Sequence, residues 1–528
     1  MKRMVFGALS GAVLTFALGL ILAPGARAAA PAIDAGALYV QHCQTCHGVG
    51  RLGGMGPALL PENLHRTGRK KALAVIADGR TATQMPPFKT VLRKDQIAAL
   101  RDFIFTPPAV RPTWDMDKIK ASYVLHNDPA GLPPHPVYKG DPLNLFTVVE
   151  AGDHHVTILD GDTFTPLWRF PSRFALHGGA KYSPDGRFVY LGSRDGWVSM
   201  YDLYNLKPVA EIRAGINMRN IAVSADGRYV LAGNYLPHSL VLLNAKNLRP
   251  IKEIKVEDAH GVTSRVSAVY TAPPRHSFIV ALKDIPEIWE ISYEDHPRPV
   301  AKGMIHSYEK GMLEGAFDTG KFPIRRIKLA SILDDFFFDQ GYDTVVGASR
   351  NGKGGQVINL NVGLKIADID LPGMPHLGSG ITFTYKGRPV MATPHLKDGV
   401  VSVIDMTTWK TIKRIKTLGP GFFMRGHKNS PYAWVDVFFG PNRDAMQVID
   451  TRTLKIVKTL RPAPGKTSAH VEFDRSGAHA LVSIWDTNGA IVVYDAKTFK
   501  EVKRIPMKKP VGKYNVYNKI TYSRGTSH

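Results

Sequence analysis

VSMYDLYNLKPVAEI, residues 198–212, contains an apolar strand that ends in Asp202, a short turn, and a second strand that carries a basic residue. The same arrangement recurs as VTILDGDTFTPLWRF (156–170), LVLLNAKNLRPIKEI (240–254), VSVIDMTTWKTIKRI (401–415), MQVIDTRTLKIVKTL (446–460) and IVVYDAKTFKEVKRI (491–505). Each copy predicts two adjacent strands joined by a turn. The repetition therefore indicates an internally repetitive all-β domain.

The residue that ends the first strand marks the period of this repeat. The strong markers are Asp160, Asp202, Asn244, Asp405, Asp450 and Asp495. Their spacing is 42 and 42 residues in the first group and 45 and 45 in the second, and weaker copies end at Ser292 and Asn359. A period of about 40 to 50 residues with four short strands is typical of a propeller blade. Eight units therefore predict an eight-bladed β-propeller over residues 141–528.

One interval of the repeat is longer than the others. Ser292 and Asn359 are 67 residues apart, which indicates an inserted loop in that blade. The extra length is expected to include KFPIRRIK (321–328) and DDFFFDQ (334–340). The insertion is either an exposed excursion or a lid over one face of the propeller.

Residues 1–28 have the pattern of a secretory signal peptide. Lys2 and Arg3 precede an apolar run, and Ala26-Arg27-Ala28 resembles a signal-peptidase site. An uncleaved membrane anchor is the alternative, but the apolar run from Val5 to Ala23 is short for a membrane span and ends in a processable site. The rest of the chain shows no long apolar run, so we expect a soluble exported protein. The formal net charge of +23 favours anionic partners or ligands. Export argues against nucleic acid as the partner.

HCQTCH, residues 42–47, holds both cysteines of the chain. Cys-x-x-Cys-His is the spacing of covalent haem attachment, in which Cys43 and Cys46 each bind a haem vinyl group and His47 binds the iron. A redox dithiol or a small disulfide loop is the alternative. The surrounding sequence lacks a thioredoxin-like strand and helix pattern, which favours the haem.

Residues 29–106 resemble a small c-type cytochrome, with helical segments before and after the haem motif. The resemblance implies a methionine as second axial ligand of haem c, which is Met85 in QMPPF or, less well placed, Met55. We expect the Pro57 carbonyl to accept a hydrogen bond from His47, a common way to orient a ligand imidazole. Residues 107–140 are dense in proline and predict a semi-rigid linker.

An eight-bladed propeller beside a cytochrome suits two redox ligands, pyrroloquinoline quinone and haem d1. The quinone enzymes commonly have a disulfide between adjacent cysteines and a repeated tryptophan-rich motif. Both cysteines of this chain are used by the haem motif, and its seven tryptophans follow no blade period. Haem d1 is therefore the better prediction.

Several segments resemble the cytochrome cd-type nitrite reductases. They are RFALHGGAKYSPDGRFVYLGSRDGWVSMYDL (173–203), MPHLGSG (374–380), VMATPHLKDG (390–399), AHVEFDRSG (469–477) and GKYNVYNK (512–519). The resemblance implies that His177 binds the iron of haem d1 and that His376 lies on its distal side, with His395 nearby. A second distal histidine of those reductases is missing, and Asp334 or Asp335 takes its place.

That departure makes the chain most similar to the NirN-type dihydro-haem d1 dehydrogenases. The resemblance implies a periplasmic oxidoreductase of haem d1 biosynthesis that converts a propionate side chain of dihydro-haem d1 into an acrylate. The covalent haem c would pass the electrons to an external periplasmic acceptor. A nitrite reductase or another haem d1 protein would receive the product. A nitrite reductase activity and a non-catalytic haem d1 carrier stay open as alternatives.

The dehydrogenation requires a base and a clamp for the carboxylates of the substrate. His470 is the first candidate for the base because a neutral imidazole accepts protons near pH 7. His376 is the second, and Tyr514 could polarise a carboxylate or relay a proton. Arginine binds carboxylates in bidentate fashion, and Arg194, Arg219 and Arg265 occupy matching places in successive blades. We expect structural or surface roles for four other histidines, His395, His427, His154 and His155.

Overall fold

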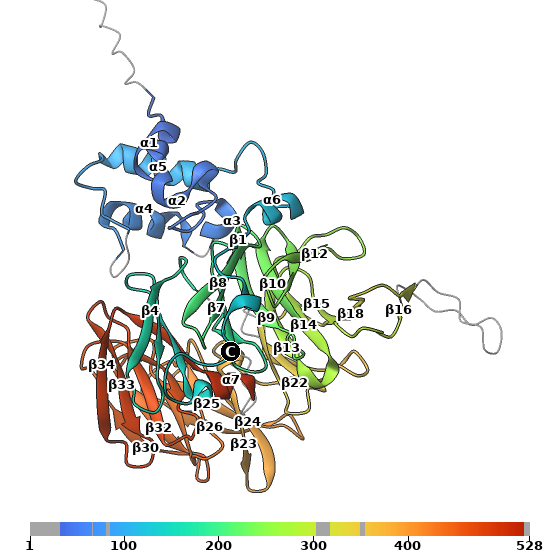
Figure 1. The fold of residues 1–528 in the computed structure, drawn as a ribbon. Helices are drawn as coiled ribbons and strands as arrows, with labels where there is room; N and C mark the ends of the chain where they lie inside the picture. Colours follow the sequence, from blue (N-terminus) through green and yellow to red (C-terminus); the bar gives the residue numbers. More distant parts are fainter. Residues whose placement is uncertain are drawn as a thin grey trace, which may run out of the picture.

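The computed structural model describes residues 32–65, 67–80, 85–176, 178–301, 317–348 and 354–521. The predicted signal peptide lies outside these residues. The described chain forms a helical unit that lies against one side of a ring of β-sheets (Figure 1). None of the helices in the described ranges is long and apolar enough to cross a membrane.

The helical unit has the order expected of a small cytochrome. It contains α1 (Ala35–His42), α2 (Gln44–His47), η1 (Val49–Arg51), α3 (Pro61–Leu64), α4 (Gly68–Asp78) and α5 (Lys94–Phe105). Asp34 caps α1 by accepting a hydrogen bond from the backbone nitrogen of Ala37 at 2.9 Å. Apolar side chains of α1, α4 and α5, among them Tyr39, Ile76 and Leu100, form the core of the unit.

The ring consists of eight blades, each a four-stranded antiparallel sheet, which confirms the predicted propeller. The first four blades contain β35 (Pro510–Asn515), β2 (Phe146–Glu150), β3 (His155–Leu159) and β4 (Pro166–Pro171); β5 (Lys181–Tyr182), β6 (Phe188–Gly192), β7 (Trp197–Asp202) and β8 (Lys207–Arg213); β9 (Asn217–Val223), β10 (Tyr229–Leu236), β11 (Ser239–Asn244) and β12 (Pro250–Lys255); and β13 (Val266–Ala272), β14 (Ser277–Leu282), β15 (Glu287–Ser292) and β18 (Ile324–Lys328). The other four contain β19 (Asp335–Phe338), β20 (Thr344–Ala348), β21 (Gly355–Asn359) and β22 (Leu364–Ile369); β23 (Ile381–Tyr385), β24 (Arg388–Pro394), β25 (Val400–Asp405) and β26 (Thr411–Lys416); β27 (Met424–Arg425), β28 (Tyr432–Asp436), β29 (Met446–Asp450) and β30 (Lys455–Leu460); and β31 (Ser468–Phe473), β32 (His479–Ile484), β33 (Gly489–Asp495) and β34 (Glu501–Met507).

Seven of the eight marker residues end the third strand of their blade, and Asp160 directly follows its strand. The aspartates among them shape the turn that comes next. The Asp202 carboxylate accepts hydrogen bonds from the backbone nitrogens of Tyr204 and Asn205, at 2.8 and 3.2 Å. Asp405 and Asp495 accept the equivalent pairs of bonds in their own blades. An Asx turn of this kind fixes a tight connection, which explains why an aspartate or asparagine recurs at this position.

The C-terminal strand β35 closes the ring. It pairs with β2, so that Asn515 lies opposite Phe146 and Tyr514 lies opposite Thr147. The first blade is thus built from both ends of the propeller sequence. This closure places Tyr514 on an innermost strand, and the following helix α7 (Val516–Ile520) lies across the ring near its axis (Figure 1).

The structure corrects the predicted insertion. IRRIK forms β18, the regular outer strand of its blade, and DFFF forms β19, the innermost strand of the next blade. Three consecutive phenylalanines suit an innermost strand that is buried on both faces. The extra length instead lies between β15 and β18, where β16 (Val300–Ala301) pairs with β17 (Phe317–Asp318). Residues 302–316 lie outside the described residues. Whether the insertion covers a face of the propeller as a lid therefore stays a prediction.

The segment predicted as a linker packs on the propeller. It forms α6 (Met116–Ala121), β1 (Val124–Leu125) and η2 (Pro129–Gly131). The short helix η3 (Pro142–Asn144) follows the predicted linker. β1 pairs with β8 and adds a fifth strand to that blade. Ile119 of α6 is fully buried in the core of the same blade. Much of the segment is therefore anchored on this blade of the propeller.

The helical unit and the propeller share a small apolar interface. Leu52, Ala58 and Leu60 of the helical unit pack against Ile216 and Leu236 of the propeller. At its edge the Arg213 guanidinium, at the end of β8, donates to the Leu52 carbonyl and lies 4.6 Å from the centre of the Trp114 ring. The residues after the haem motif are thereby held on the propeller.

Candidate functional site

The haem motif spans the junction of α1 and α2. Cys43 lies between the two helices, Cys46 lies within α2, and the two half-buried thiols are not joined in a disulfide. His47 ends α2 and is buried, and its Nδ1 donates to the Pro57 carbonyl at 2.8 Å, as predicted. This bond leaves Nε2 as the metal-binding nitrogen. Two unpaired thiols beside an oriented imidazole fit a covalent haem c.

Glycine is required beside this histidine. A Cβ added to Gly56 would lie 2.8 Å from Cε1 of the His47 ring, so a larger residue would displace the imidazole. The loop is thus shaped around His47.

The two candidate methionines differ in exposure. Met55 is 49% exposed, whereas Met85 is half-buried and its carbonyl accepts a hydrogen bond from the backbone nitrogen of Arg80 at 3.1 Å. Residues 81–84, which lead to Met85, lie outside the described residues. Met85 as the second axial ligand stays a prediction.

Replacing Met85 with alanine is expected to abolish the sulfur-to-iron charge-transfer band of the oxidised haem c, because the thioether would be lost as a ligand. The absorption spectrum of the purified variant measures this. Met55→Ala is the matched control and should keep the band. A band that survives in Met85→Ala and vanishes in Met55→Ala would reverse the assignment.

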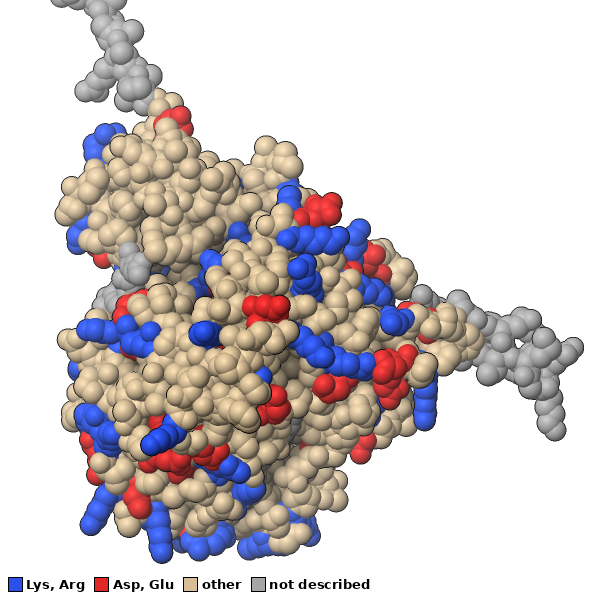
Figure 2. Space-filling view, in the orientation of Figure 1, with Lys and Arg blue, Asp and Glu red and all other residues tan. Residues whose placement is uncertain are grey.

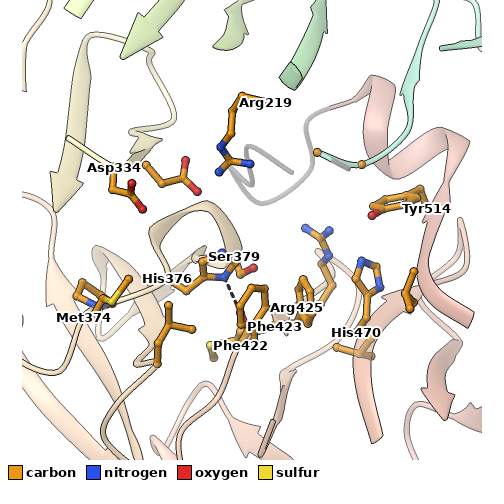
Figure 3. Close-up of a pocket in the computed structure, with 18 of the residues that line it drawn as sticks. Arg219, Asp334, Met374, His376, Ser379, Phe422, Phe423, Arg425, His470 and Tyr514 are labelled. Atoms are coloured by element: carbon orange, nitrogen blue, oxygen red, sulfur yellow. Dashed lines mark hydrogen bonds between the residues drawn. The ribbon is translucent and has the colours of Figure 1, made fainter. Parts of the chain in front are cut away.

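A cavity lies on the axis of the propeller, where innermost strands and the loops between blades converge (Figure 3). Its polar wall is formed by Arg194, Arg219, Asp334, His376, Arg425, His470 and Tyr514, and its apolar wall includes Met374, Phe422 and Phe423. Apolar surfaces with a few convergent charged groups are typical of a site for a flat organic ligand with anionic substituents. The lining thus fits a tetrapyrrole that carries carboxylates.

His470 enters this cavity from a β-bulge in β31. The pairing with β32 passes directly from Ala469 to Val471, and His470 is the extra residue, with a φ of 53°. The Lys513 ammonium donates to the His470 carbonyl and to the Ser483 hydroxyl, which holds the bulge. Bulges commonly redirect one side chain at an active site.

The surroundings of His470 keep its imidazole neutral. Burial, followed by the charges of Lys513, Arg425 and Lys519, lowers its pKa well below the ordinary value of 6.5. Its Nδ1 has no hydrogen-bond partner among the described residues. The ring centre lies 4.7 Å from that of Phe423 and 5.1 Å from that of Tyr514. His470 is thus a neutral, buried proton acceptor.

His376 lies on the opposite side of the cavity from His470 (Figure 3). Its Nδ1 donates to the Phe422 carbonyl at 2.6 Å, and its ring packs on that of Phe422 with a centre-to-centre distance of 4.2 Å. Burial lowers the pKa of His376 as well. The structure thus brings both predicted histidines into one cavity, with the phenylalanine pair between them.

Asp436, which sequence reasoning did not single out, ties the two histidines together. Its carboxylate accepts hydrogen bonds from the backbone nitrogens of Phe422, Phe423 and His470, at 2.7, 3.0 and 3.3 Å. Burial raises its pKa to about 7. Asp436 is fully buried behind the cavity wall, so it positions the histidines without reaching a ligand.

Tyr514 faces His470 from β35. Its side chain is half-buried, and burial raises the pKa of its hydroxyl to about 12. The phenol therefore stays protonated at neutral pH and can donate a hydrogen bond into the cavity.

Three arginines line the cavity, and sequence reasoning missed one of them. Arg219 lies on β9, where its Nε donates to the Ser267 carbonyl at 2.8 Å, and Arg194 follows β6. Arg425 on β27 is 9% exposed, and its guanidinium lies 3.5 Å from the Glu472 carboxylate. The Arg219 and Arg425 guanidinium groups point toward the space between the two histidines (Figure 3).

The blade period contains a signal that would have found Arg425. Four cavity residues lie 25 residues before the marker of their own blade: Arg219 before Asn244, Asp334 before Asn359, Arg425 before Asp450, and His470 before Asp495. His177 has the same offset from Asp202, although it lies outside the described residues. The offset marks the axial position of the innermost strand.

Arg265 departs from the prediction. It does not line the cavity, and its guanidinium forms a two-pronged ion pair with Asp284, at 2.6 and 2.9 Å. A guanidinium that forms a bidentate ion pair with a carboxylate has few N–H donors left for a ligand. The clamp predicted at Arg265 is thus not found in this geometry, and Arg425 takes its place on the cavity wall.

The two aspartates in place of the missing histidine both reach the cavity. The Asp334 carboxylate forms an ion pair with the Lys283 ammonium, and the Asp335 carboxylate accepts a hydrogen bond from the Tyr270 hydroxyl at 2.9 Å. Both are therefore engaged as acceptors.

The remaining histidines have other partners. His395 is fully buried and its Nε2 hydrogen-bonds the Ser402 hydroxyl at 2.9 Å, and His427 packs on the Phe473 ring. His154 packs on Phe174, and His155 lies 3.2 Å from the Asp153 carboxylate. None of these four lines the cavity.

Known families match both parts of the chain. Residues 140–519 match the cytochrome D1 heme domain, and residues 30–104 match subunit III of cbb3-type cytochrome c oxidase. The chain is 54% identical to a dihydro-heme d1 dehydrogenase of Pseudomonas aeruginosa, over 98% of this chain and 100% of that protein. It is 27% identical to a nitrite reductase of Stutzerimonas stutzeri, over 98% of each chain.

A solved structure agrees with these sequence matches. The dihydro-heme d1 dehydrogenase NirN in complex with DHE aligns with a TM-score of 0.84 and 54% identity, covering 92% of this chain and 99% of that one. The chain therefore belongs to the dihydro-haem d1 dehydrogenases, a family of oxidoreductases that join a cytochrome c domain to a haem d1-type propeller.

Proposed function

We propose that this protein dehydrogenates a propionate side chain of dihydro-haem d1 to an acrylate, as the last oxidation in haem d1 biosynthesis. The observation that carries this is one axial cavity that combines a neutral buried histidine, three arginines and a protonated tyrosine, directly beside a cytochrome domain. The reaction removes two protons and two electrons from adjacent carbons. The histidine can accept protons, and the cytochrome domain can accept electrons.

Substrate binding rests on the arginines and on an iron ligand. Arg194, Arg219 and Arg425 grip the carboxylates of the ring, and the apolar wall at Phe422 and Phe423 packs on its face. His177 is the proposed axial ligand of the substrate iron; it lies outside the described residues.

His470 is the proposed base. It accepts a proton from the side-chain carbon next to the carboxylate, while Tyr514 donates a hydrogen bond to that carboxylate and stabilises the charge that develops on it. His376 packs across the Phe422 and Phe423 pair and is the second candidate.

Electrons leave through the cytochrome domain. Cys43 and Cys46 would hold haem c, with His47 and Met85 as axial ligands, and this group supplies one-electron transfer when bound. Tyr235 lines the cavity, and the next residue, Leu236, packs on Ala58 and Leu60 of the cytochrome domain. Tyr235 and Leu236 thus connect the cavity wall to the interface with the cytochrome domain.

The acid limb of the turnover rate is expected to lie below pH 6.5, the ordinary pKa of histidine, because burial and nearby cations lower the pKa of His470. The base then stays deprotonated and active as the pH falls from 8 toward 6.5. Initial rates with saturating substrate over this range measure the limb. A limb centred above pH 6.5 would contradict the neutral buried base.

Two alternatives make different demands on the site. Nitrite reduction needs distal proton donors, but the Asp334 carboxylate is engaged in an ion pair with Lys283. A pure haem d1 carrier has no use for an electron-transfer domain. Mass spectrometry of the tetrapyrrole after anaerobic incubation with an acceptor tests the proposal: the product should have lost two hydrogen atoms, and an unchanged mass would favour a carrier.

We also propose that the protein is exported to the periplasm, with residues 29–106 as the electron-transfer domain and 141–528 as the substrate domain. Its acceptor is an external redox protein, and a nitrite reductase or another haem d1 protein receives the product.

Basic and acidic groups intermix over the propeller, whereas the visible face of the cytochrome domain is mostly uncharged (Figure 2). Val40, Val49 and Met55 are exposed on that domain, which suits docking of an electron-transfer partner.

A further inference from the structure

A second cavity lies beneath the substrate cavity, at the other end of the propeller axis. It is lined by residues of four neighbouring innermost strands and of α7, including Lys181, Tyr270, Phe338, Asn518 and Lys519. Pro184, which is exposed, lies on its rim, so the cavity opens toward solvent. None of the roles assigned above uses these residues.

Lys519 lies between the two cavities. Its side chain lines the lower cavity, and its Nζ lies 5.3 Å from the centre of the Tyr514 ring, which lines the upper cavity. The Nζ atom is buried and has no hydrogen-bond partner within the described residues. A buried ammonium or amine needs partners, and in a polar cavity water supplies them.

The neighbours of Lys519 are also polar and buried. The side-chain Nδ2 of Asn518 donates to the Glu472 carboxylate at 3.2 Å. The side-chain oxygen Oδ1 of Asn518 has no protein partner in the described part of the chain. A donor and an acceptor thus remain for water at the same place. Polar side chains that can bind water therefore lie between the two cavities at this point.

The charges around Lys519 allow it to exchange protons. Burial, followed by the positive charges of Arg425 and Lys181, lowers its pKa well below the ordinary value, and the Glu472 carboxylate opposes this effect. The lower cavity also contains Lys181, whose pKa burial lowers to about 8. Lys181 can therefore accept and release a proton near neutral pH, and the lowered pKa of Lys519 makes its proton easier to release.

The proposed reaction creates a need for an outlet. Conversion of –CH2–CH2–COO⁻ to –CH=CH–COO⁻ releases two protons, and two electrons pass one at a time through haem c to the external acceptor. A single base must release its first proton before it can accept the second. Bound tetrapyrrole would cover His470 from above, since the histidine is only 4% exposed even without it.

We propose that Lys519 and the lower cavity form a proton outlet, which carries protons from His470 past Tyr514 to solvent on the far face of the propeller. Each imidazolium N–H proton passes through water beside the Tyr514 ring to the Lys519 amine, and Lys519 then releases a proton to water in the lower cavity. This inference rests on the proposed function, because it assumes that His470 accepts the protons of the substrate.

The test uses the intact protein loaded with haem c and the variant Lys519→Met, which removes the amine and keeps the length of the side chain. Without an acceptor, the first electron should reach haem c at close to the unmodified rate, measured by anaerobic stopped flow. With an excess of oxidised small cytochrome c as acceptor, turnover should fall about tenfold or more, because His470 is not reset. Added methylamine should restore the rate in proportion to its concentration.

The controls separate an outlet from a structural role. Lys519→Arg keeps the positive charge but cannot release the proton, so it should be as slow as Lys519→Met. Lys246→Met, an exposed lysine on an outer turn, should leave the rate unchanged. Lys519→Gln repeats the test should the methionine variant fail to fold, as judged by thermal unfolding and by the Soret band of bound substrate.

Three outcomes would overturn the outlet. They are unmodified turnover in Lys519→Met, a first electron that is slowed as much as turnover, and a loss that methylamine does not reverse. Failure of the proposed function looks different, because the unmodified protein itself would then not reduce haem c with dihydro-haem d1.

Discussion

Replacing His470 with asparagine is expected to slow the reduction of haem c by dihydro-haem d1 about a hundredfold to ten-thousandfold, the usual effect of removing a general base. Substrate affinity should stay close to normal, because the arginines and the iron ligand are untouched. Asparagine is the sharper choice than alanine here, since it tolerates the left-handed backbone that His470 adopts at a φ of 53°. Anaerobic stopped-flow absorbance measures the rate, and a Soret titration measures the affinity.

His376→Ala is the control for this experiment. A smaller loss in His376→Ala supports His470 as the base. A larger loss would assign the proton transfer to His376, and equal large losses would indicate that the two act as one unit. Unmodified rates in both variants would contradict a histidine base.

Removing the Arg219 guanidinium should weaken substrate binding by about 2 to 5 kcal/mol, which is roughly thirtyfold or more in Kd. Arg219→Met keeps the volume of the side chain, but it leaves a substrate carboxylate in a buried site without its cation. Arg425→Met should act in the same direction. The dissociation constant from a Soret titration with dihydro-haem d1 measures the effect.

Arg265→Met is the matched control for Arg219→Met. Arg265 lies 27 residues before Ser292, two residues out of phase with Arg219, and its guanidinium is bound by Asp284 and does not line the cavity. The substitution should change the Kd by no more than about twofold, because a part-exposed ion pair adds little. Equal losses in Arg219→Met and Arg265→Met would contradict the assignment of the clamp to the arginines that line the cavity.

The architecture could be predicted from the sequence because one turn chemistry repeats. The aspartate or asparagine after the third strand fixes the connection to the fourth, and its spacing alone predicts eight blades. The same period also places the axial side chains, since Arg219, Asp334, Arg425 and His470 share one offset from their markers. Arg425 belongs to no familiar motif, so only this offset identifies it in the sequence.

Other features depend on contacts that have no sequence period. DFFF was predicted as part of an insertion, yet it is an innermost strand whose burial on both faces removes the alternating pattern. Arg265 was predicted as a clamp because of its residue type, but the fold pairs its guanidinium with Asp284. Asp436 connects three backbone nitrogens from two blades, so its role depends on the closed ring.

The most direct test of the central claim is to mix the anaerobic, oxidised protein with dihydro-haem d1 and record the absorbance of haem c. The account predicts that haem c becomes reduced without any added reductant, and that an excess of acceptor yields two reduced acceptors for each acrylate formed. Binding of the tetrapyrrole with a normal Soret shift, but with haem c left oxidised, would contradict the account and leave a carrier in its place.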